Sequence, residues 1–361
     1  MEIPARHILR QGCNSVVENN ELLVDWSLIE NCNWRCSYCF ADRRYVSKFI
    51  PSLEQLKCAA DNLLAMNKSR YYLYLIGGEI TIIPHFVPFI EYLNEIFGDK
   101  VELMLVTNGY RPWQYFDNLI ALSRNKLNIT ISIHSEFVKL DRLVSIVENI
   151  SPKATLSFGL LYHLGKKAYV KEIFSVLSEM KKNYRFGLSI APVLVPPSYT
   201  EADPNYTAED HTWMKKGNKT CKLLEKISGT EPDSVWPFTL NYDVLEDGVE
   251  RSLTSAAMTD KLTEGYLNFK DMYCCQGIGY FYLSHTGECR GSRCPINIGP
   301  VANFFEPGAQ LYQVKKFPVA MKCQLDNCVC APHHILPKFR DLRETLAFVR
   351  NAHKKIAMEH S

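Results

Sequence analysis

Three cysteines stand close together near the start of the chain, at positions Cys32, Cys36 and Cys39. With 13 cysteines in 361 residues, three at fixed offsets arise by chance only about 0.02 times per chain. A structural zinc site takes four closed ligands, and this loop offers no nearby fourth cysteine or histidine. An iron–sulfur cluster on three thiolates would instead leave one iron open to a non-protein ligand, where chemistry could take place.

A second group of seven cysteines lies within 57 positions in the last quarter of the chain. Its members are Cys274, Cys275, Cys289, Cys294, Cys323, Cys328 and Cys330. This density predicts a second metal site, and a zinc knuckle is the alternative that needs no chemistry. The isolated Cys13, Cys58 and Cys221 are expected to pack as small hydrophobic residues.

The residues between the two cysteine groups alternate between β-rich apolar runs and amphipathic helical patterns. The predicted strands are Leu22–Ile29, Tyr71–Ile76, Val101–Val106, Asn128–His134, Thr155–Tyr162 and Phe186–Val195. The predicted helices are Ser52–Met66, Phe86–Phe97, Trp113–Ser123, Phe137–Glu148 and Ala168–Lys182. Such repeated βα units predict an α/β fold, a partial (β/α)6 TIM-like barrel, in which ligands gather at the carboxyl ends of the strands.

Polar residues fall at several of these carboxyl ends. The sequence Gly77-Gly78-Glu79 follows the second predicted strand, Asn108 follows the third, and Ser132 and His134 close the fourth. A Gly-Gly pair is common in turns, so it gains meaning here from its place behind the three-cysteine loop. A histidine in such a place serves either as a structural residue or as an acid or base.

The rest of the chain is organised differently from the barrel. We predict the barrel over residues 1–200 and a polar insertion or bridge over 201–270, with a strand-like stretch at Ser234–Val244. A small cysteine-rich domain with a hairpin at Ile278–Ser284 is predicted over 271–335, and a C-terminal helix over 336–361.

Composition excludes several classes of partner. The net charge is +2 and the signs alternate along the chain, so nucleic acid and anionic membranes are not expected to bind. No window approaches the roughly 20 apolar residues of a membrane helix, and Met1 to Leu23 lack the apolar core of a signal peptide. We therefore expect a cytoplasmic protein, whose cysteines are more suited to metal binding or catalysis than to disulfides.

The three-cysteine loop resembles the signature of radical SAM enzymes, a C-x3-C-x-aromatic-C loop after the first strand of a partial (β/α)6 barrel. The resemblance implies that Cys32, Cys36 and Cys39 hold a 4Fe-4S cluster. It also implies that S-adenosylmethionine binds the fourth iron and is cleaved by one electron to a 5′-deoxyadenosyl radical. Tyr38, at the aromatic position, would lie beside the adenine.

The polar strand ends take roles from the same resemblance. Gly77, Gly78 and Glu79 would meet the amino group of S-adenosylmethionine, although Ile80 replaces the usual proline of a GGEP motif. Asn108 belongs to a TNG sequence that members of the family often carry. Ser132 and His134 would meet the ribose or carboxylate, and His134 is also a candidate acid or base.

The second cysteine group resembles the SPASM or twitch extensions of radical SAM enzymes, without their full seven-cysteine spacing. The resemblance implies one auxiliary 4Fe-4S cluster on Cys274, Cys294, Cys328 and Cys330, with Cys323 as the substitute ligand. Cys275 and Cys289 of this group are not assigned to the cluster. Each is either a hydrogen-atom donor to a substrate radical or an inert buried thiol.

The function that follows is hydrogen abstraction from a substrate, with maturation of a ribosomally synthesised peptide as the first hypothesis. A dehydrogenase or dehydratase of a carbohydrate-like small molecule is the second, and a non-enzymatic zinc or iron–sulfur protein is the third. The expected partners are the substrate and a reductase or flavodoxin-type electron donor. Because the barrel is expected to begin within 25 residues of Met1, a leader peptide would be bound by a separate protein or by the barrel itself.

Overall fold

The structure is a computed structural model of the 361-residue chain. It describes residues 6–12, 19–39, 47–125, 127–195, 201–231, 241–246, 248–254, 269–294, 299–309, 319–324 and 336–359. The chain divides into two compact units. Unit 1 consists of Met1–Trp26, Glu54–Tyr72 and Trp236–Ser361, and unit 2 consists of Ser27–Leu53 and Leu73–Val235. The boundaries of these units differ from the domain boundaries predicted from the sequence. Those domain boundaries stay predictions.

Unit 2 is built on parallel strands. Its strands are the end of β2 (Glu21–Ile29), most of β3 (Arg70–Gly77), β4 (Val101–Thr107), β5 (Asn128–Ile133), β6 (Thr155–Tyr162) and β7 (Gly187–Pro192). Strands β4 to β7 pair in chain order with parallel register, for example Thr107 with Ile131 and Ser132 with Gly159. All six predicted strands are therefore confirmed to within a few residues, and the α/β barrel-like class is confirmed with them.

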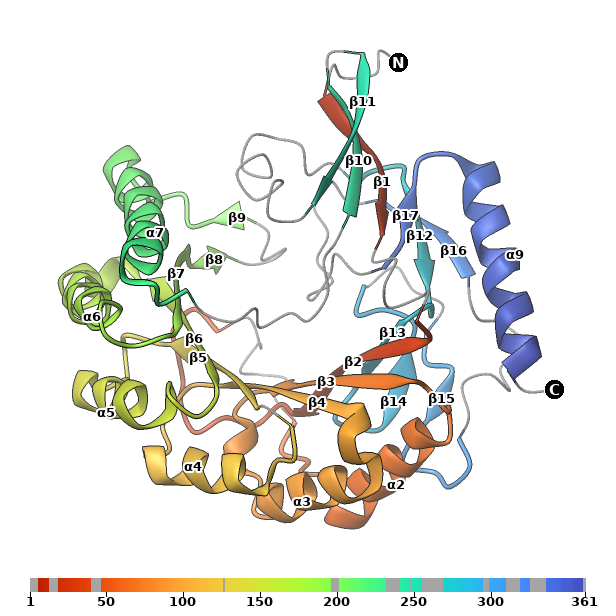
Figure 1. Cartoon of the computed structure of the whole chain (residues 1–361), viewed down its shortest axis with the longest axis horizontal. Helices are drawn as coiled ribbons and strands as arrows, with labels where there is room; N and C mark the ends of the chain where they lie inside the picture. Colours follow the sequence, from red (N-terminus) through yellow and green to blue (C-terminus); the bar gives the residue numbers. More distant parts are fainter. Residues whose placement is uncertain are drawn as a thin grey trace. The chain divides into compact units, whose positions relative to one another are not determined.

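Helices cover one face of these strands (Figure 1). They are α3 (Phe86–Phe97), α4 (Trp113–Leu122), α5 (Leu140–Ile150) and α6 (Lys167–Met180). Each buries one apolar stripe, which is the pattern that predicted it. Helix α5 begins three residues later than predicted, and Phe137, which precedes it, stacks on Trp34 with ring centroids 5.6 Å apart.

The predicted insertion contains a long helix around Cys221, whose bounds were not predicted. Helix α7 (Ala208–Ser228) begins with a capping box between Thr207 and Asp210 and ends at Gly229, whose φ is 64°. It packs on β7, and the fully buried Lys181 pairs with Glu225 of α7 at 2.5 Å. The sequence did not show the bounds of this helix, because its overall hydrophobicity is low. Only a narrow stripe with Met214, Gly217 and Cys221 is buried.

Unit 1 is built largely on an antiparallel sheet, with strand order β11-β10-β1-β17-β12-β16. These strands are β1 (Arg6–Gly12), β10 (Asn241–Glu246), β11 (Val249–Thr254), β12 (Tyr273–Gln276), β16 (Val319–Lys322) and β17 (Lys338–Phe339). Strand β1 was not predicted. The strand-like stretch at Ser234–Val244 is described only from residue 241, where β10 begins.

A second set of strands in unit 1 contains the predicted hairpin. Strand β13 (Tyr280–Leu283) pairs in parallel with the first part of β2, and β14 (Glu288–Arg290) pairs with β13 and with β15 (Ala302–Asn303). Helices α2 (Leu53–Leu64) and α9 (Leu342–Glu359) complete the unit. The predicted C-terminal helix is therefore confirmed, except that its first residues form β17.

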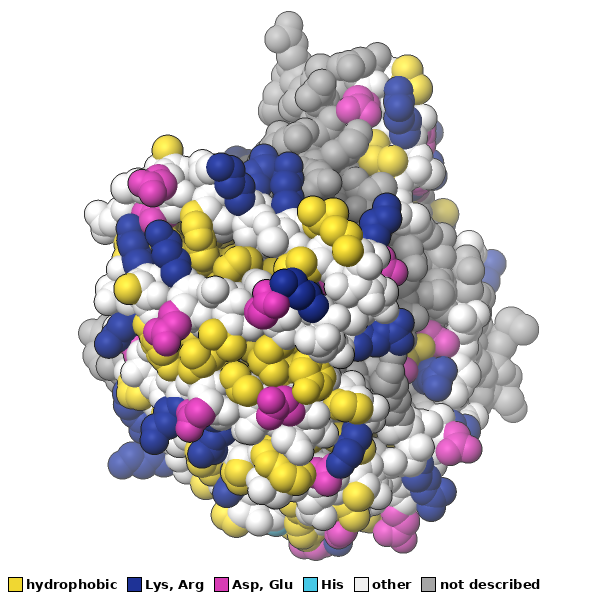
Figure 2. All heavy atoms as spheres, turned by 60° about the vertical axis from the view of Figure 1, so that its left-hand side comes forward, with side chains coloured by type: hydrophobic (Ala, Val, Ile, Leu, Met, Phe, Trp, Pro, Cys, Tyr) yellow, Lys and Arg dark blue, Asp and Glu magenta, His cyan; other side chains and the backbone are white. Residues whose placement is uncertain are grey.

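The surface carries mixed charge. Figure 2 shows one face on which Lys and Arg side chains are interspersed with Asp, Glu and hydrophobic side chains, as the alternating signs of the sequence predict. Among the residues that the structure describes, every helix is too short or too polar to span a membrane.

Candidate functional site

The three-cysteine loop (residues 31–39) follows β2 directly and brings its thiols close together. The backbone N–H of Cys39 donates to the carbonyl of Cys36 at 3.2 Å, which folds the loop into a turn. Burial, together with the charges of Cys39 and Cys32, raises the pKa of Cys36 to about 12. Three free thiols in such proximity fit the donor set of a 4Fe-4S cluster.

A single-ion site is not formed by this loop. Among the described ranges, no three His, Cys, Asp or Glu side chains converge on one ion-sized position. A cluster takes each thiolate at a separate iron, so its ligands need not converge on one point. Binding of a cluster by these three thiols therefore stays a prediction.

Glu79 joins the carboxyl ends of β3 and β4 from a fully buried position. Its Oε1 accepts hydrogen bonds from Thr81 N at 3.0 Å, Thr81 Oγ1 at 2.5 Å and Thr107 Oγ1 at 2.7 Å. Its Oε2 accepts from Asn108 N at 2.6 Å. Burial raises the pKa of Glu79 and these donors oppose the rise. Both carboxylate oxygens of Glu79 thus accept hydrogen bonds from within the protein. Contact between Glu79 and a cofactor stays a prediction.

The glycines beside Glu79 are required by close backbone approach. A Cβ on Gly78 would lie 2.2 Å from the carbonyl oxygen of Asn31, and one on Gly77 would lie 2.2 Å from that of Ile29. These positions bring the end of β3 against the start of the three-cysteine loop, where Glu79 N donates to Asn31 O at 2.9 Å. The Gly-Gly pair thus permits the loop and the Glu79 position to meet.

Three neighbouring strand ends hold the three-cysteine loop. The Asn108 amide after β4 donates to Asn33 Oδ1 at 2.9 Å. After β5, Glu136 accepts from Ser37 N at 2.8 Å. After β6, His163 Nε2 lies 3.4 Å from Ser37 Oγ. Glu136 was not a predicted site residue, and its only sequence signal is its position two residues beyond His134.

Tyr38 and His134 form a half-buried aromatic pair. The Tyr38 hydroxyl lies 3.1 Å from His134 Nδ1, and the two rings are nearly parallel with centroids 5.8 Å apart. Burial lowers the pKa of His134 to about 4. His134 is therefore neutral near pH 7 and can exchange a hydrogen bond with Tyr38. Ser132, also a predicted site residue, is partly exposed on β5.

A pocket of about 230 Å³ opens beside Tyr38. Ser37 and His163 line one side, and Val193, Asp203 and Tyr206 lie among the remaining lining residues. Its lining combines aromatic rings with a few polar groups. The pocket lies at the ends of β6 and β7, and binding of a ligand there stays a prediction.

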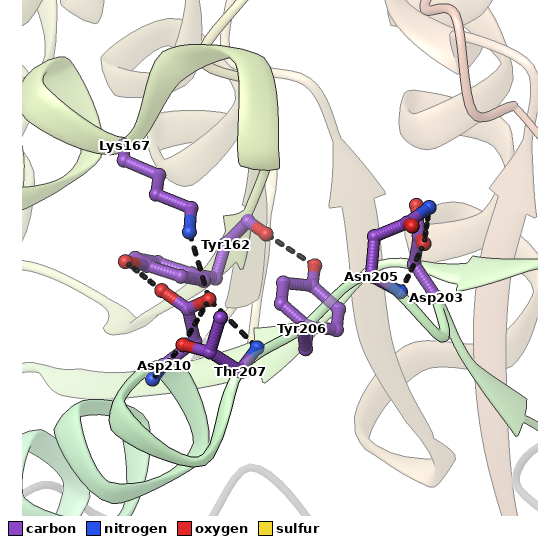
Figure 3. A network of polar contacts seen from close by, with 7 residues as sticks. All are labelled: Tyr162, Lys167, Asp203, Asn205, Tyr206, Thr207 and Asp210. Carbon is purple, nitrogen blue, oxygen red and sulfur yellow. Dashed lines mark hydrogen bonds and ion pairs between the residues drawn. The ribbon is translucent and has the colours of Figure 1, made fainter.

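A network of hydrogen bonds holds Tyr206, which lines this pocket (Figure 3). The Tyr206 hydroxyl donates to the carbonyl of Tyr162 and accepts from Val193 N. Asp210 accepts from the Tyr162 hydroxyl at 3.0 Å and from Lys167 Nζ at 2.7 Å. The Lys167 ammonium holds the pKa of Asp210 well below its usual range. The start of α7 is thereby attached to β6 and α6.

Unit 1 contains the described members of the second cysteine group. Cys274 lies on β12, opposite Met321 of β16 and Lys338 of β17, and Cys323 directly follows β16. The end of β12 also adjoins the segment leading to Cys294, because Gly277 N donates to Gly291 O at 3.2 Å. The sheet thus brings Cys274 and the residue before Cys323 onto paired strands, and the position of Cys294 relative to them stays a prediction. Cys328 and Cys330 lie outside the described residues.

The two candidate hydrogen-atom donors are buried. Cys275 packs with Ile278 of unit 1 and with Val349 and Ala352 of α9, and Cys289 is fully buried on β14. Burial raises the pKa of both thiols. This placement favours the inert alternative, and a catalytic role for either thiol stays a prediction.

A buried ion pair stands beside Cys294. Asp25 of β2 is fully buried, accepts from the Tyr280 hydroxyl at 3.0 Å, and lies 3.6 Å from Arg293 Nε. Its Oδ1 has no hydrogen-bond partner among the described residues. Burial raises the pKa of Asp25 to about 6, and Arg293 and Tyr280 oppose the rise.

The Asp25 pKa predicts a pH dependence of stability. Because the folded state binds this proton more tightly, the stabilisation is full below the ordinary Asp pKa and is lost as pH rises through about 6. We expect the wild-type protein to lose about 1 kcal/mol of unfolding free energy between pH 5 and pH 7 relative to Asp25→Asn. Urea unfolding of the cluster-free protein at both pH values measures this. The exposed Asp61→Asn serves as control, and equal slopes in wild type and Asp25→Asn would contradict the shift.

Comparison with known proteins gives one family match. Residues 26–197 match the Radical SAM superfamily. This stretch of the chain therefore resembles that superfamily, which is the class that the three-cysteine loop predicted.

Individual relatives give the extent of the likeness. An S-adenosylmethionine-dependent nucleotide dehydratase of Psychrobacter lutiphocae is 30% identical over 130 residues, which is 33% of this chain and 42% of that protein. The structure of anSMEcpe with bound AdoMet matches with a TM-score of 0.55 and 17% identity, over 82% of this chain and 81% of that chain. The complex of anSMEcpe with AdoMet and the Cp18Cys peptide matches with a TM-score of 0.52 and 17% identity, over 79% and 77%. The fold likeness therefore extends beyond the radical SAM domain.

Proposed function

We propose that the protein uses S-adenosylmethionine to start a radical reaction on a peptide substrate. The observation that carries the proposal is the three-cysteine loop, held at the carboxyl edge of parallel strands beside a pocket. When bound, the cluster and S-adenosylmethionine supply a 5′-deoxyadenosyl radical that abstracts hydrogen. The protein itself binds, orients and shields the reactants.

The proposed roles follow the contacts of the site. Cys32, Cys36 and Cys39 hold the cluster, and Glu79 keeps the strand ends beneath the loop in place through its four accepted hydrogen bonds. Tyr38 presents its ring to the pocket, and the neutral His134 orients the Tyr38 hydroxyl. The adenine of S-adenosylmethionine would occupy this pocket.

A peptide is favoured over a small molecule by the extent of the fold likeness. The match to a structure that contains a peptide covers 79% of this chain and thus includes residues outside the barrel. The likeness to the nucleotide dehydratase covers only 33%, and so supports shared cofactor chemistry more than a shared substrate. A carbohydrate-like or nucleotide substrate is the second candidate, and that relative is the observation in its favour.

One experiment separates the two candidates. The reduced protein is incubated with S-adenosylmethionine and either pooled synthetic peptides of about 18 residues, nucleoside triphosphates or amino sugars. We expect peptides alone to raise 5′-deoxyadenosine formation above the uncoupled rate and to yield a product lighter by two hydrogens. Turnover of a nucleotide or sugar with none of the peptides would overturn the peptide substrate. A flavodoxin-type protein is the proposed electron donor, and it can replace dithionite in the same assay.

We also propose an auxiliary 4Fe-4S cluster in unit 1 on Cys274, Cys294, Cys328 and Cys330, with Cys323 as substitute. The pairing of β12, which carries Cys274, with β16, which leads to Cys323, supports it. Four irons per cluster predict about eight irons per reconstituted chain. Cys294→Ala should lower this to about four while uncoupled cofactor cleavage continues, and Cys58→Ala should change neither. An unchanged iron content in Cys294→Ala would remove Cys294 from the ligand set.

A further inference from the structure

Two N–H groups point at the sulfur of Cys32. The backbone N–H of Trp34 lies 3.4 Å from Cys32 Sγ, and the side-chain amide of Asn108 lies 3.9 Å from it. The same Asn108 amide donates to Asn33 Oδ1 at 2.9 Å. An amide nitrogen carries two hydrogens, so one can serve Asn33 while the other faces the sulfur.

The side chain of Asn108 is held from both ends. Its Oδ1 accepts from Tyr110 N at 3.0 Å, which fixes which way the amide group faces. Asn108 is also nearly fully buried, at 4% exposure. The amide therefore meets the three-cysteine loop in a set orientation, with little competition from water.

The link between Asn108 and Glu79 uses the backbone. Asn108 N donates to Glu79 Oε2 at 2.6 Å, and this bond does not depend on the Asn108 side chain. A substitution at position 108 can therefore remove the donor to Cys32 while the Glu79 contacts remain. This separation allows the two roles to be tested apart.

A thiolate is an acceptor only, and the sulfurs of a cluster gain negative charge when the cluster takes an electron. Hydrogen bonds to cluster sulfurs favour the reduced state for that reason and help to set the reduction potential. We propose that Asn108 is a positioning residue that holds the Cys32 sulfur and stabilises the reduced cluster through an N–H···S hydrogen bond. This rests on Cys32 being a ligand of the cluster.

The test compares two substitutions that differ in shape and charge. Asn108→Asp keeps the size of the side chain but replaces the donor by an acceptor, whereas Asn108→Ala only removes the donor. The fraction of reduced cluster is measured at the wild-type midpoint potential, using the paramagnetic resonance signal that changes when S-adenosylmethionine is added. The rate of iron loss to a chelator is the second readout. Asn128→Ala is the matched control, because its buried amide donates to Glu102 instead.

We expect the ratio of reduced to oxidised cluster to fall about three- to tenfold in Asn108→Ala and further in Asn108→Asp, with faster iron loss in both. A purely structural role predicts the reverse order, since aspartate fills the same space. Wild-type values in Asn108→Asp, or values closer to wild type than those of Asn108→Ala, would overturn the proposal.

A further variant tests the proposal even if Asn108→Ala and Asn108→Asp do not fold. Asn33 is exposed, so Asn33→Ala removes the partner of the Asn108 amide with little cost to packing. Because Tyr110 N still fixes the Asn108 amide in this variant, the proposal predicts a ratio of reduced to oxidised cluster no lower than in the wild type. A fall as large as that expected for Asn108→Ala would overturn it, since the donor to Cys32 is still present. A wild-type protein that binds no iron would instead refute the cluster site itself, and that outcome is read before any variant is compared.

Discussion

Replacement of Cys36 by alanine should abolish formation of 5′-deoxyadenosine. Cys36 is the most buried of the three loop thiols, at 6% exposure, and a cluster with two protein ligands would be held too weakly to present an open iron. We expect cofactor cleavage to fall by more than about a thousandfold, because the remaining pathway lacks the electron-transferring group. Liquid chromatography of the reduced, reconstituted protein measures it.

Cys221→Ala is the matched control for this substitution. Cys221 is a buried thiol of α7, and its loss should leave both iron content and cleavage at the wild-type level. Cleavage that survives in Cys36→Ala would show that the thiols of residues 32, 36 and 39 do not carry the chemistry.

Loss of the Glu79 carboxylate should have the second largest effect. Glu79→Ala leaves the buried donors of Thr81, Thr107 and Asn108 without their acceptor, and each unsatisfied donor costs about 1–3 kcal/mol. We expect the free energy of unfolding to fall by at least about 3 kcal/mol, together with most of the bound iron. Urea unfolding and iron assay measure the two effects.

Glu79→Gln tests the geometry more finely. Its single oxygen can serve the three donors at Oε1, but its amide N–H then faces the N–H of Asn108. We expect a loss of about 1–2 kcal/mol and retention of part of the iron. The exposed Glu91→Gln of α3 should match wild type. If Glu79→Ala unfolded at the wild-type urea concentration, the four hydrogen bonds would not stabilise the strand ends.

The barrel was predictable because its strands and helices satisfy local rules. Each strand is an apolar run of β-forming residues and each helix buries one stripe, so the periodicity determined element type and nearly the bounds. The bounds of helix α7 were not predicted, because its surface is mostly polar and its stability depends on contacts with residues far along the chain, such as that of Lys181 with Glu225. Strand β1 was not predicted, because the strands it pairs with, β10 and β17, lie more than 200 residues later in the sequence.

The candidate site was predictable only in part, for the same physical reason. Spacing identified Cys32, Cys36 and Cys39, since ligands on one loop are local in sequence. The contacts of Glu136 with Ser37 and of Asn33 with Asn108 join different strand ends, and no local pattern encodes such pairs. The inward, fully bonded position of Glu79 also depends on Thr107, 28 residues away.

The central claim is that Cys32, Cys36 and Cys39 hold a cluster that cleaves S-adenosylmethionine. The most direct test is anaerobic reconstitution with iron and sulfide, followed by reduction with dithionite and measurement of methionine and 5′-deoxyadenosine. We expect both products to form in equal amounts in the wild-type protein and neither to form in Cys36→Ala. Zinc in place of iron in the reconstituted protein, or equal product formation by the two proteins, would contradict it.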